Sequence, residues 1–206
     1  MIKKFSIELV LLALLTLFVS FFYNIDLKIH NFFNNADKPF DNNYFKNFFI
    51  EITDLGSSFW VFVLSFFCFF FSYPFSKKLF VFKKIKVFSV FLFLSIVLSG
   101  ALTQLMKHIL ARPRPNYAIE DNFFGFSYFN LESSFHSFPS GHTSTIFAVA
   151  LVLSVFTPNI KFFYFFFAGL VSFSRVVVGA HFFTDVVGGI VVAFIGVKIA
   201  KIILFK

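Results

Sequence analysis

The sequence contains few charged residues and almost no cysteine. Only 14% of its 206 residues are Asp, Glu, Lys or Arg, whereas soluble domains have about 25%. The one cysteine, Cys68, lies inside an apolar run, so a single chain can form neither a disulfide framework nor a cysteine-based metal site. The composition therefore excludes a disulfide-stapled domain and argues strongly against a soluble one.

Hydrophobic residues take the place of the missing charges. They make up 58% of the chain, phenylalanine occurs 41 times, and the mean hydropathy is +0.85. Apolar runs of about 20 residues recur, which is the length that a helix needs to cross the hydrocarbon core of a bilayer. The sequence predicts an all-α integral membrane protein with one membrane-embedded domain, residues 1–206, and six transmembrane helices. The predicted spans are residues 5–23, 57–76, 87–106, 143–157, 162–179 and 184–204.

Basic residues at the ends of these runs predict an orientation in the membrane. The connection 77–86 holds five lysines and no acidic residue. Because cytoplasmic loops carry an excess of Lys and Arg, we expect this connection and both termini in the cytoplasm. The connections 24–56 and 107–142 and the turn near 180–184 are then expected on the opposite side. This distribution accounts for the net charge of +8 without a nucleic-acid-binding surface.

Three polar stretches lie between the predicted spans. They are KHILARPRP at 107–115, FPSGHTS at 138–144 and SRVVVGAHFFTD at 174–185. Each has a simple structural explanation of its own, as interfacial anchors, as a turn with a helix N-cap, or as an i,i+4 surface pair. The predicted topology, which uses only lysine counts and apolar length, nevertheless places all three at one face of the membrane. One shared functional site explains that placement better than three unrelated causes.

The basic residues and the Ser-Gly turn in these stretches are suited to binding an anion. Lys107, Arg114 and Arg175 would form a clamp for oxyanions, because guanidinium groups match phosphate through paired hydrogen bonds. The turn at Ser140 and Gly141 leads into a helix whose free N–H groups and dipole favour an anion. Gly141 also has no Cβ to keep a ligand away from the backbone. Phosphate is the natural occupant of such a site.

Two histidines and an aspartate supply reactive groups. His181 and Asp185 are four residues apart, so on a helix they would share one face. The carboxylate can accept the proton of one ring nitrogen and leave the other nitrogen as a nucleophile. His142, from another segment, can then act as general acid on the leaving oxygen. No Asp, Glu and His cluster has the spacing of metal ligands, so we expect a metal-independent reaction through phosphohistidine.

The three stretches resemble the signature motifs of the type 2 phosphatidic acid phosphatase superfamily. The matches are Lys107 with Arg114 and Pro115 for K-x6-RP, Pro139 to His142 for PSGH, and Ser174, Arg175, His181 and Asp185 for SR-x5-H-x3-D. All three spacings fit without a gap, in the family's order, over residues 107–185. The resemblance implies a membrane core of six helices with the active site at the outer leaflet.

The resemblance also implies roles for single residues. It implies His181 as the nucleophile, Asp185 as its orienting partner, and His142 as general acid and then base. The phosphate would be held by Lys107, Arg114, Ser140, Gly141 and Arg175. Arg112 and Pro113 repeat the Arg-Pro pair two residues early, but the spacing selects Arg114 and leaves Arg112 as an accessory residue.

These features predict a membrane lipid phosphatase without a metal or another cofactor. We expect it in a bacterial cytoplasmic (inner) membrane, with the active site on the periplasmic or extracellular side. The expected partners are the bilayer and a phosphorylated lipid, with no nucleic acid and no obligate protein partner. Candidate substrates are phosphatidylglycerophosphate, phosphatidic acid, the 1-phosphate of lipid A and undecaprenyl diphosphate.

Two alternatives and one loop stay open at this point. The chain could be a non-catalytic protein that binds lipid phosphates, or a transporter. A transporter would need charges near the middle of several spans, whereas the charges here gather at span ends. The loop 116–138 is acidic and aromatic, so it could form a lid or headgroup-selecting wall, or only an aromatic belt at the interface.

Overall fold

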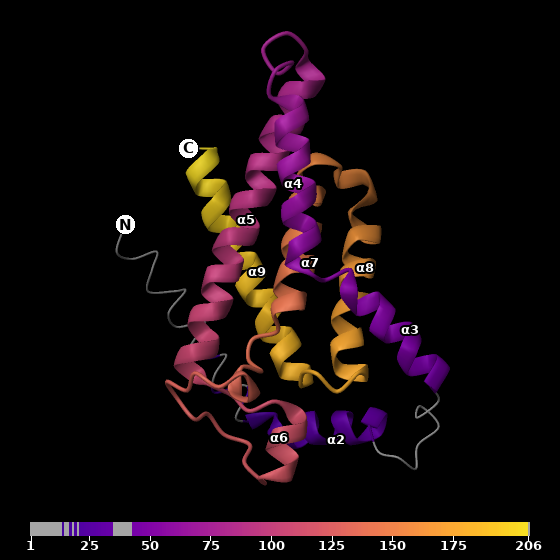
Figure 1. Ribbon diagram of the computed structural model, residues 1–206, viewed down its shortest axis with the longest axis vertical. Helices are drawn as coiled ribbons and strands as arrows, with labels where there is room; N and C mark the ends of the chain where they lie inside the picture. Colours follow the sequence, from indigo (N-terminus) through magenta and orange to yellow (C-terminus); the bar gives the residue numbers. More distant parts are fainter. Residues whose placement is uncertain (1–13, 15–16, 18, 20, 35–42, 206) are drawn as a thin grey trace.

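The computed structural model describes residues 14, 17, 19, 21–34 and 43–205. Within these residues the chain forms helices and loops and no β-strand, so the predicted all-α class is confirmed (Figure 1). The α-helices are α2 (Tyr23–Asn34), α3 (Asn43–Asp54), α4 (Ser58–Ser72), α5 (Phe80–Leu110), α6 (Pro115–Glu120), α7 (Gly141–Phe156), α8 (Lys161–Val177) and α9 (Phe183–Leu204). Two short 3-10 turns are η1 (Ser133–Phe135) and η2 (Pro158–Ile160).

Most of the predicted spans correspond to helices. Four stretches of the described chain are long and apolar enough to cross a membrane, and α7 is apolar but shorter. The four stretches are Tyr44–Ser72, Phe80–Glu120, Pro158–Val177 and Phe183–Leu204. Most of the first predicted span, 5–23, lies outside the described residues, so the total of six stays a prediction.

Helix α5 is longer than the predicted span 87–106. Its 31 residues extend over about 46 Å at a rise of about 1.5 Å per residue. The prediction of a loop over 77–86 was wrong from Phe80 onward, because Lys is a good helix former and α5 includes Lys83, Lys84 and Lys86. At the other end Ala111 adopts a left-handed conformation with φ 48° and its N–H donates to the carbonyl of Lys107. Pro113 follows, and the motif segment therefore leaves the helix abruptly.

The connection 24–56 also contains more helix than its composition suggested. It holds most of α2, which lies across one end of the molecule, and α3, which packs on α8 (Figure 1). Gly56 lies in the short break between α3 and α4. A Cβ added there would come within 2.9 Å of Val171 Cγ1 and 3.0 Å of His142 Cβ. The glycine therefore lets this break approach the start of α7 closely.

The centre of the bundle is formed by α5, α7 and α9, with α4 packed on α5 and α8 packed on α7. Fully buried apolar side chains of the three central helices meet in one cluster; they include Phe91, Leu92, Ala148, Val152 and Ala193. Phenylalanines on α4 and α8, among them Phe66, Phe70, Phe162 and Phe166, are exposed. Such an apolar outer surface suits contact with lipid chains.

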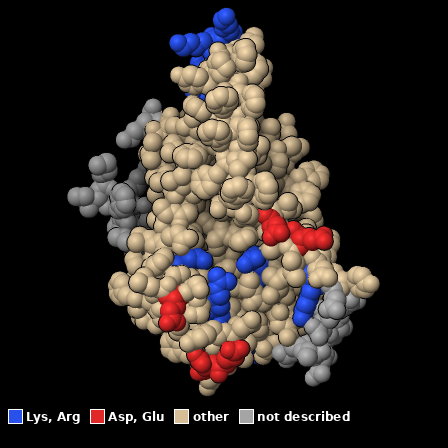
Figure 2. Space-filling model, in the orientation of Figure 1, with Lys and Arg blue, Asp and Glu red and all other residues tan. Residues whose placement is uncertain are grey.

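All three polar stretches lie at the same end of this bundle. The last turn of α5, the start of α7 and the turn between α8 and α9 meet there, close to α2 and α6 (Figure 1). On the face that Figure 2 shows, basic side chains gather around a hollow near this end and again at the tip of the α4–α5 hairpin. A broad uncharged band separates the two groups, as expected for the part of the molecule inside a bilayer.

Candidate active site

A pocket of about 530 Å³ opens between α4, α5 and the start of α7. Most of the predicted site residues line it, namely Lys107, Arg114, Gly141, His142, Arg175 and His181. Ser140 and Asp185 are buried and do not line the pocket. A larger pocket of about 670 Å³ lies at the opposite end among Lys77, Lys83 and Lys86, but its lining contains no histidine and no acidic residue. Reactive groups therefore mark the smaller pocket as the candidate site.

Neutral oxygens hold each of the three cations in place. Lys107 Nζ donates to the carbonyl of His136 at 2.9 Å, and Arg114 Nε donates to the carbonyl of Ser133 at 3.2 Å. Arg175 Nη1 donates to Thr53 Oγ1 at 2.8 Å. None of the ion pairs found among the described residues involves these three side chains. Their positive charge is therefore left for an anion in the pocket.

The PSGH stretch is anchored to the start of α9. The Ser140 N–H donates to the carbonyl of Asp185 at 3.0 Å, and Ser140 is the N-cap residue of α7. A Cβ added at Gly189 would lie 2.7 Å from the Ser140 carbonyl oxygen, so glycine lets the two segments touch. Gly141 begins α7 and lines the pocket. The pocket therefore contains a helix N-terminus, which favours an anion.

The two histidines approach the pocket from different elements. His142 is half-buried in the first turn of α7. His181 is buried in the turn before α9, since α9 begins only at Phe183. The expectation that His181 and Asp185 share one helix face was therefore wrong, because the histidine precedes the helix. They are still neighbours, with His181 Nδ1 at 3.6 Å from Asp185 Oδ2.

Burial sets the protonation of His181. It lowers the pKa of the ring to about 4, although the neighbouring Asp185 carboxylate acts in the opposite direction. At neutral pH the imidazole is therefore uncharged and keeps one nitrogen lone pair. A neutral ring is what an attack on phosphorus requires.

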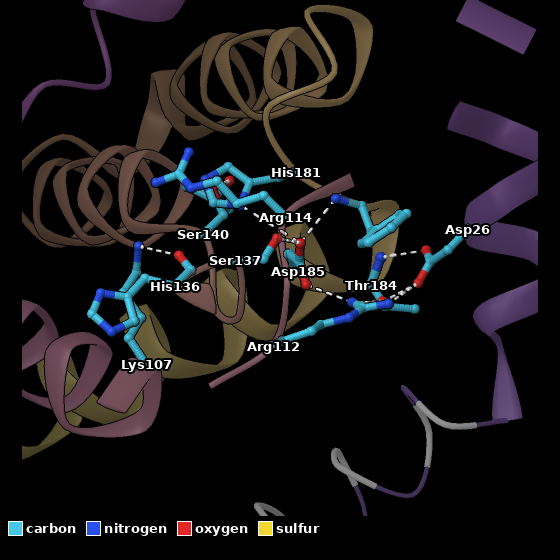
Figure 3. A network of polar contacts seen from close by, with 12 residues as sticks. Asp26, Lys107, Arg112, Arg114, His136, Ser137, Ser140, His181, Thr184 and Asp185 are labelled. Carbon is cyan, nitrogen blue, oxygen red and sulfur yellow. Dashed lines mark hydrogen bonds and ion pairs between the residues drawn. The ribbon is translucent and has the colours of Figure 1, made fainter. Parts of the chain in front are cut away.

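Asp185 makes its close hydrogen bonds with groups that the sequence did not predict as its partners. Its Oδ1 accepts from Arg112 Nη1 at 2.5 Å, and its Oδ2 accepts from Ser137 Oγ at 2.5 Å (Figure 3). The N–H of Phe182 donates to the same Oδ2 at 2.9 Å. The repeated Arg-Pro pair was a signal for Arg112, whereas nothing in the pattern marked Ser137.

The loop 116–138 packs against the first motif. The carbonyls of Ser133 and Ser134 accept hydrogen bonds from Arg114, and the carbonyl of His136 accepts one from Lys107. The Ser137 N–H donates to the carbonyl of Arg112 at 3.0 Å. The loop therefore helps to hold Lys107 and Arg114 in place, and its roles as a lid or a headgroup-selecting wall stay predictions.

The fold and the pocket together define a helical membrane protein with a cation-lined site that contains two histidines. A sequence profile described as the PAP2 superfamily matches residues 88–206, more than half of the chain, and the protein belongs to this superfamily. The resemblance expected from the three motifs is thus confirmed. Asp26 and the whole of α2 and α3 lie outside the matched range.

Relatives with known names point to lipid phosphatases. A lipid A 1-phosphatase of Rhizobium johnstonii is 35% identical over 100 residues, which cover 48% of this chain and 41% of the relative. The lipid A 1-phosphatase of Rhizobium etli is 34% identical over 100 residues, covering 48% and 43%. The matched stretch is therefore less than half of the length of both relatives.

Solved structures extend the likeness over most of the chain. The crystal structure of Aquifex aeolicus LpxE is 30% identical and superposes with a TM-score of 0.62, covering 84% of this chain and 93% of that one. The transmembrane PAP2 type phosphatidylglycerolphosphate phosphatase of Bacillus subtilis is 22% identical, with a TM-score of 0.66 and coverage of 95% and 94%. The second structure supports the fold alone.

Proposed function

We propose that this chain is a single-domain membrane lipid phosphatase that acts through a phosphohistidine intermediate. The observation that carries the proposal is the pocket itself. Three cations that form no ion pair with a carboxylate of the described residues meet two histidines there, at the end of a membrane-embedded helix bundle. An oxyanion fits the charge, and the histidines suit acid–base and nucleophilic work on a phosphate ester.

The proposed reaction has two steps. Lys107, Arg114 and Arg175 hold the phosphoryl oxygens while His181 attacks phosphorus and the bond to the lipid oxygen breaks. His142 takes up a proton as the bound phosphate offsets the charge of the neighbouring cations, and it gives this proton to that oxygen, so the lipid leaves as an alcohol, or as a monophosphate if the substrate is a diphosphate. His142 then takes a proton from water, which attacks the phosphohistidine, releases inorganic phosphate and restores His181.

Asp185 supports the nucleophile in both steps. Its Oδ2 lies 3.6 Å from His181 Nδ1, which places the carboxylate on one side of the ring and leaves Nε2 for phosphorus. As the ring gains positive charge, the nearby carboxylate stabilises it, as in the Asp and His of a hydrolase triad. Neither a metal ion nor another cofactor takes part in this proposed route.

The pocket suggests a lipid as the substrate. Beyond the cations its wall continues along α4 and α5 over Phe62, Ile96, Val97 and Ala101. An acyl chain could lie against this apolar wall while the headgroup phosphate reaches the clamp. The 1-phosphate of lipid A ranks first, because both curated relatives are named for that activity. Phosphatidylglycerophosphate, phosphatidic acid and undecaprenyl diphosphate remain candidates.

The proposed location is a bacterial inner membrane, with the termini cytoplasmic and the site on the periplasmic or extracellular side. The lysines at the tip of the α4–α5 hairpin lie at the end opposite to the pocket, which supports this orientation (Figure 2).

One assay tests the function. The purified protein is mixed with each of the four lipids in detergent without divalent metal, and the released phosphate is measured. We expect release from at least one lipid, inhibition by vanadate, and no release by His181→Ala. No release from any lipid by the wild-type protein, with vanadate still bound, would instead indicate a non-catalytic phosphate-binding protein.

A further inference from the structure

Arg112 lies between two buried carboxylates from distant parts of the chain. Its Nη1 donates to Asp185 Oδ1 at 2.5 Å, and its Nη2 donates to Asp26 Oδ2 at 2.8 Å (Figure 3). Arg112 is only 2% exposed, and both aspartates are buried as well. The guanidinium also lies over the ring of Phe182, 4.4 Å from its centroid. Water therefore cannot reach these two ion pairs to replace a lost partner.

Asp26 binds more than Arg112. Its Oδ1 accepts the N–H of Thr184 at 3.0 Å, and its Oδ2 accepts the hydroxyl of the same threonine. The Thr184 hydroxyl is also 2.7 Å from Arg112 Nη1. Thr184 directly precedes Asp185 in the first turn of α9. Helix α2 thus fixes both the guanidinium and the backbone on which Asp185 stands.

The two neighbouring arginines of the first motif perform different tasks. Arg114 is half-buried and lines the pocket, whereas Arg112 does not reach it. A buried carboxylate stays charged only when partners compensate for its lost hydration. Arg112 supplies the full positive charge beside Asp185. A protonated Asp185 would carry no charge beside His181 Nδ1, and a rotated Asp185 would move that charge away, so neither could stabilise the ring as it gains positive charge during attack on phosphorus.

We propose that Arg112 and Asp26 are positioning residues, with Arg112 keeping Asp185 ionised and aimed at His181 and Asp26 holding Arg112 in that place. The inference rests on the proposed phosphatase function. It also means that the site requires helix α2, which lies outside the range that the superfamily profile matches.

Two conservative variants test the proposal. Arg112→Lys keeps the charge but cannot bridge both carboxylates, and Asp26→Asn keeps the shape but removes a charge. We expect Arg112→Lys to lower kcat by about 10-fold or more and Asp26→Asn to lower it less, because misplacing a catalytic group strongly slows reaction. KM and the affinity for vanadate should change less than about 2-fold in both, since the pocket cations are untouched. The double variant should be no slower than Arg112→Lys, because the asparagine oxygen can still accept the Thr184 N–H and the lost charge of Asp26 acts through Arg112.

Arg114→Lys is the matched control. Its side chain lines the pocket, so its loss should weaken vanadate binding and raise KM, the opposite pattern to Arg112→Lys. Unchanged kcat in both test variants would overturn the positioning role while leaving the phosphatase function intact. If both test variants lose vanadate binding as well as catalytic rate, the two residues have a general structural role, and the positioning role is overturned too. A wild-type protein that hydrolyses none of the lipids would refute the proposed function instead.

Discussion

His181 Nδ1 lies 3.6 Å from Asp185 Oδ2, although one residue belongs to a turn and the other to the first turn of α9. The separation is longer than a normal hydrogen bond, while Ser137 and the Phe182 N–H donate to the same oxygen at 2.5 Å and 2.9 Å. The carboxylate is thus fixed mainly by groups other than the histidine. Its expected effect on His181 is electrostatic, through a charge that is already in place.

Asp185→Asn should therefore slow phosphorylation of the enzyme strongly. The substitution keeps the shape of the side chain but removes the charge that stabilises the ring of His181. We expect the rate of phosphoenzyme formation to fall by a factor on the order of 10² to 10⁴, measured in single turnover with a radiolabelled lipid and an alkaline quench. Ser137→Ala is the comparison, because it removes a hydrogen bond to the same carboxylate and keeps the charge. Equal losses in the two variants would contradict the electrostatic role.

Replacing His142 should separate the two steps of the reaction. An aryl phosphate with a good leaving group has little need of a general acid, whereas hydrolysis of the phosphohistidine still needs a base. His142→Ala should therefore give a burst of aryl alcohol close to the amount of enzyme, followed by turnover slower by about 10²-fold or more. Stopped-flow absorbance measures both phases. A variant that loses the burst as well would assign His142 a role in the first step even with this substrate.

Much of the pocket could be predicted because its residues stand at span ends. Lysine counts and apolar length predicted that Lys107, His142 and Arg175 lie at one face of the membrane, and in the structure all three line one pocket. Asp26 could not be found in that way. It lies 86 residues from Arg112 in the sequence, in a polar connection without a motif, and only the packing of α2 across the bundle joins the two. The start of α5 was missed because the hydropathy falls at its first lysines, although lysines are compatible with a helix.

The stability of the protein should fall between neutral pH and pH 4, partly through His181. Burial lowers its pKa from 6.5 to about 4 in the folded state, whereas the unfolded chain keeps an ordinary value. As the pH falls through this range the unfolded state binds the proton first, so stability that is present above pH 6.5 is progressively lost. The melting temperature in detergent should be lower at pH 5 than at pH 7, and His181→Gln should reduce that difference. If the difference in melting temperature between pH 5 and pH 7 is unchanged in His181→Gln, His181 is not responsible for it.

A larger side chain on the apolar wall of the pocket should slow the hydrolysis of lipids and leave the hydrolysis of small substrates unchanged. Gly100 of α5 lines the pocket, and a Cβ added there meets nothing within 4 Å, so the side chain of Gly100→Leu begins in open space. We expect kcat/KM for the preferred lipid to fall by about 10-fold or more, because a misplaced substrate reacts slowly, while hydrolysis of an aryl phosphate stays within about 2-fold. Gly169→Leu on α8 is the matched control, since Gly169 is equally open but does not line the pocket. Equal losses with both substrates in Gly100→Leu, or a similar loss in Gly169→Leu, would show that the lipid does not lie along this wall.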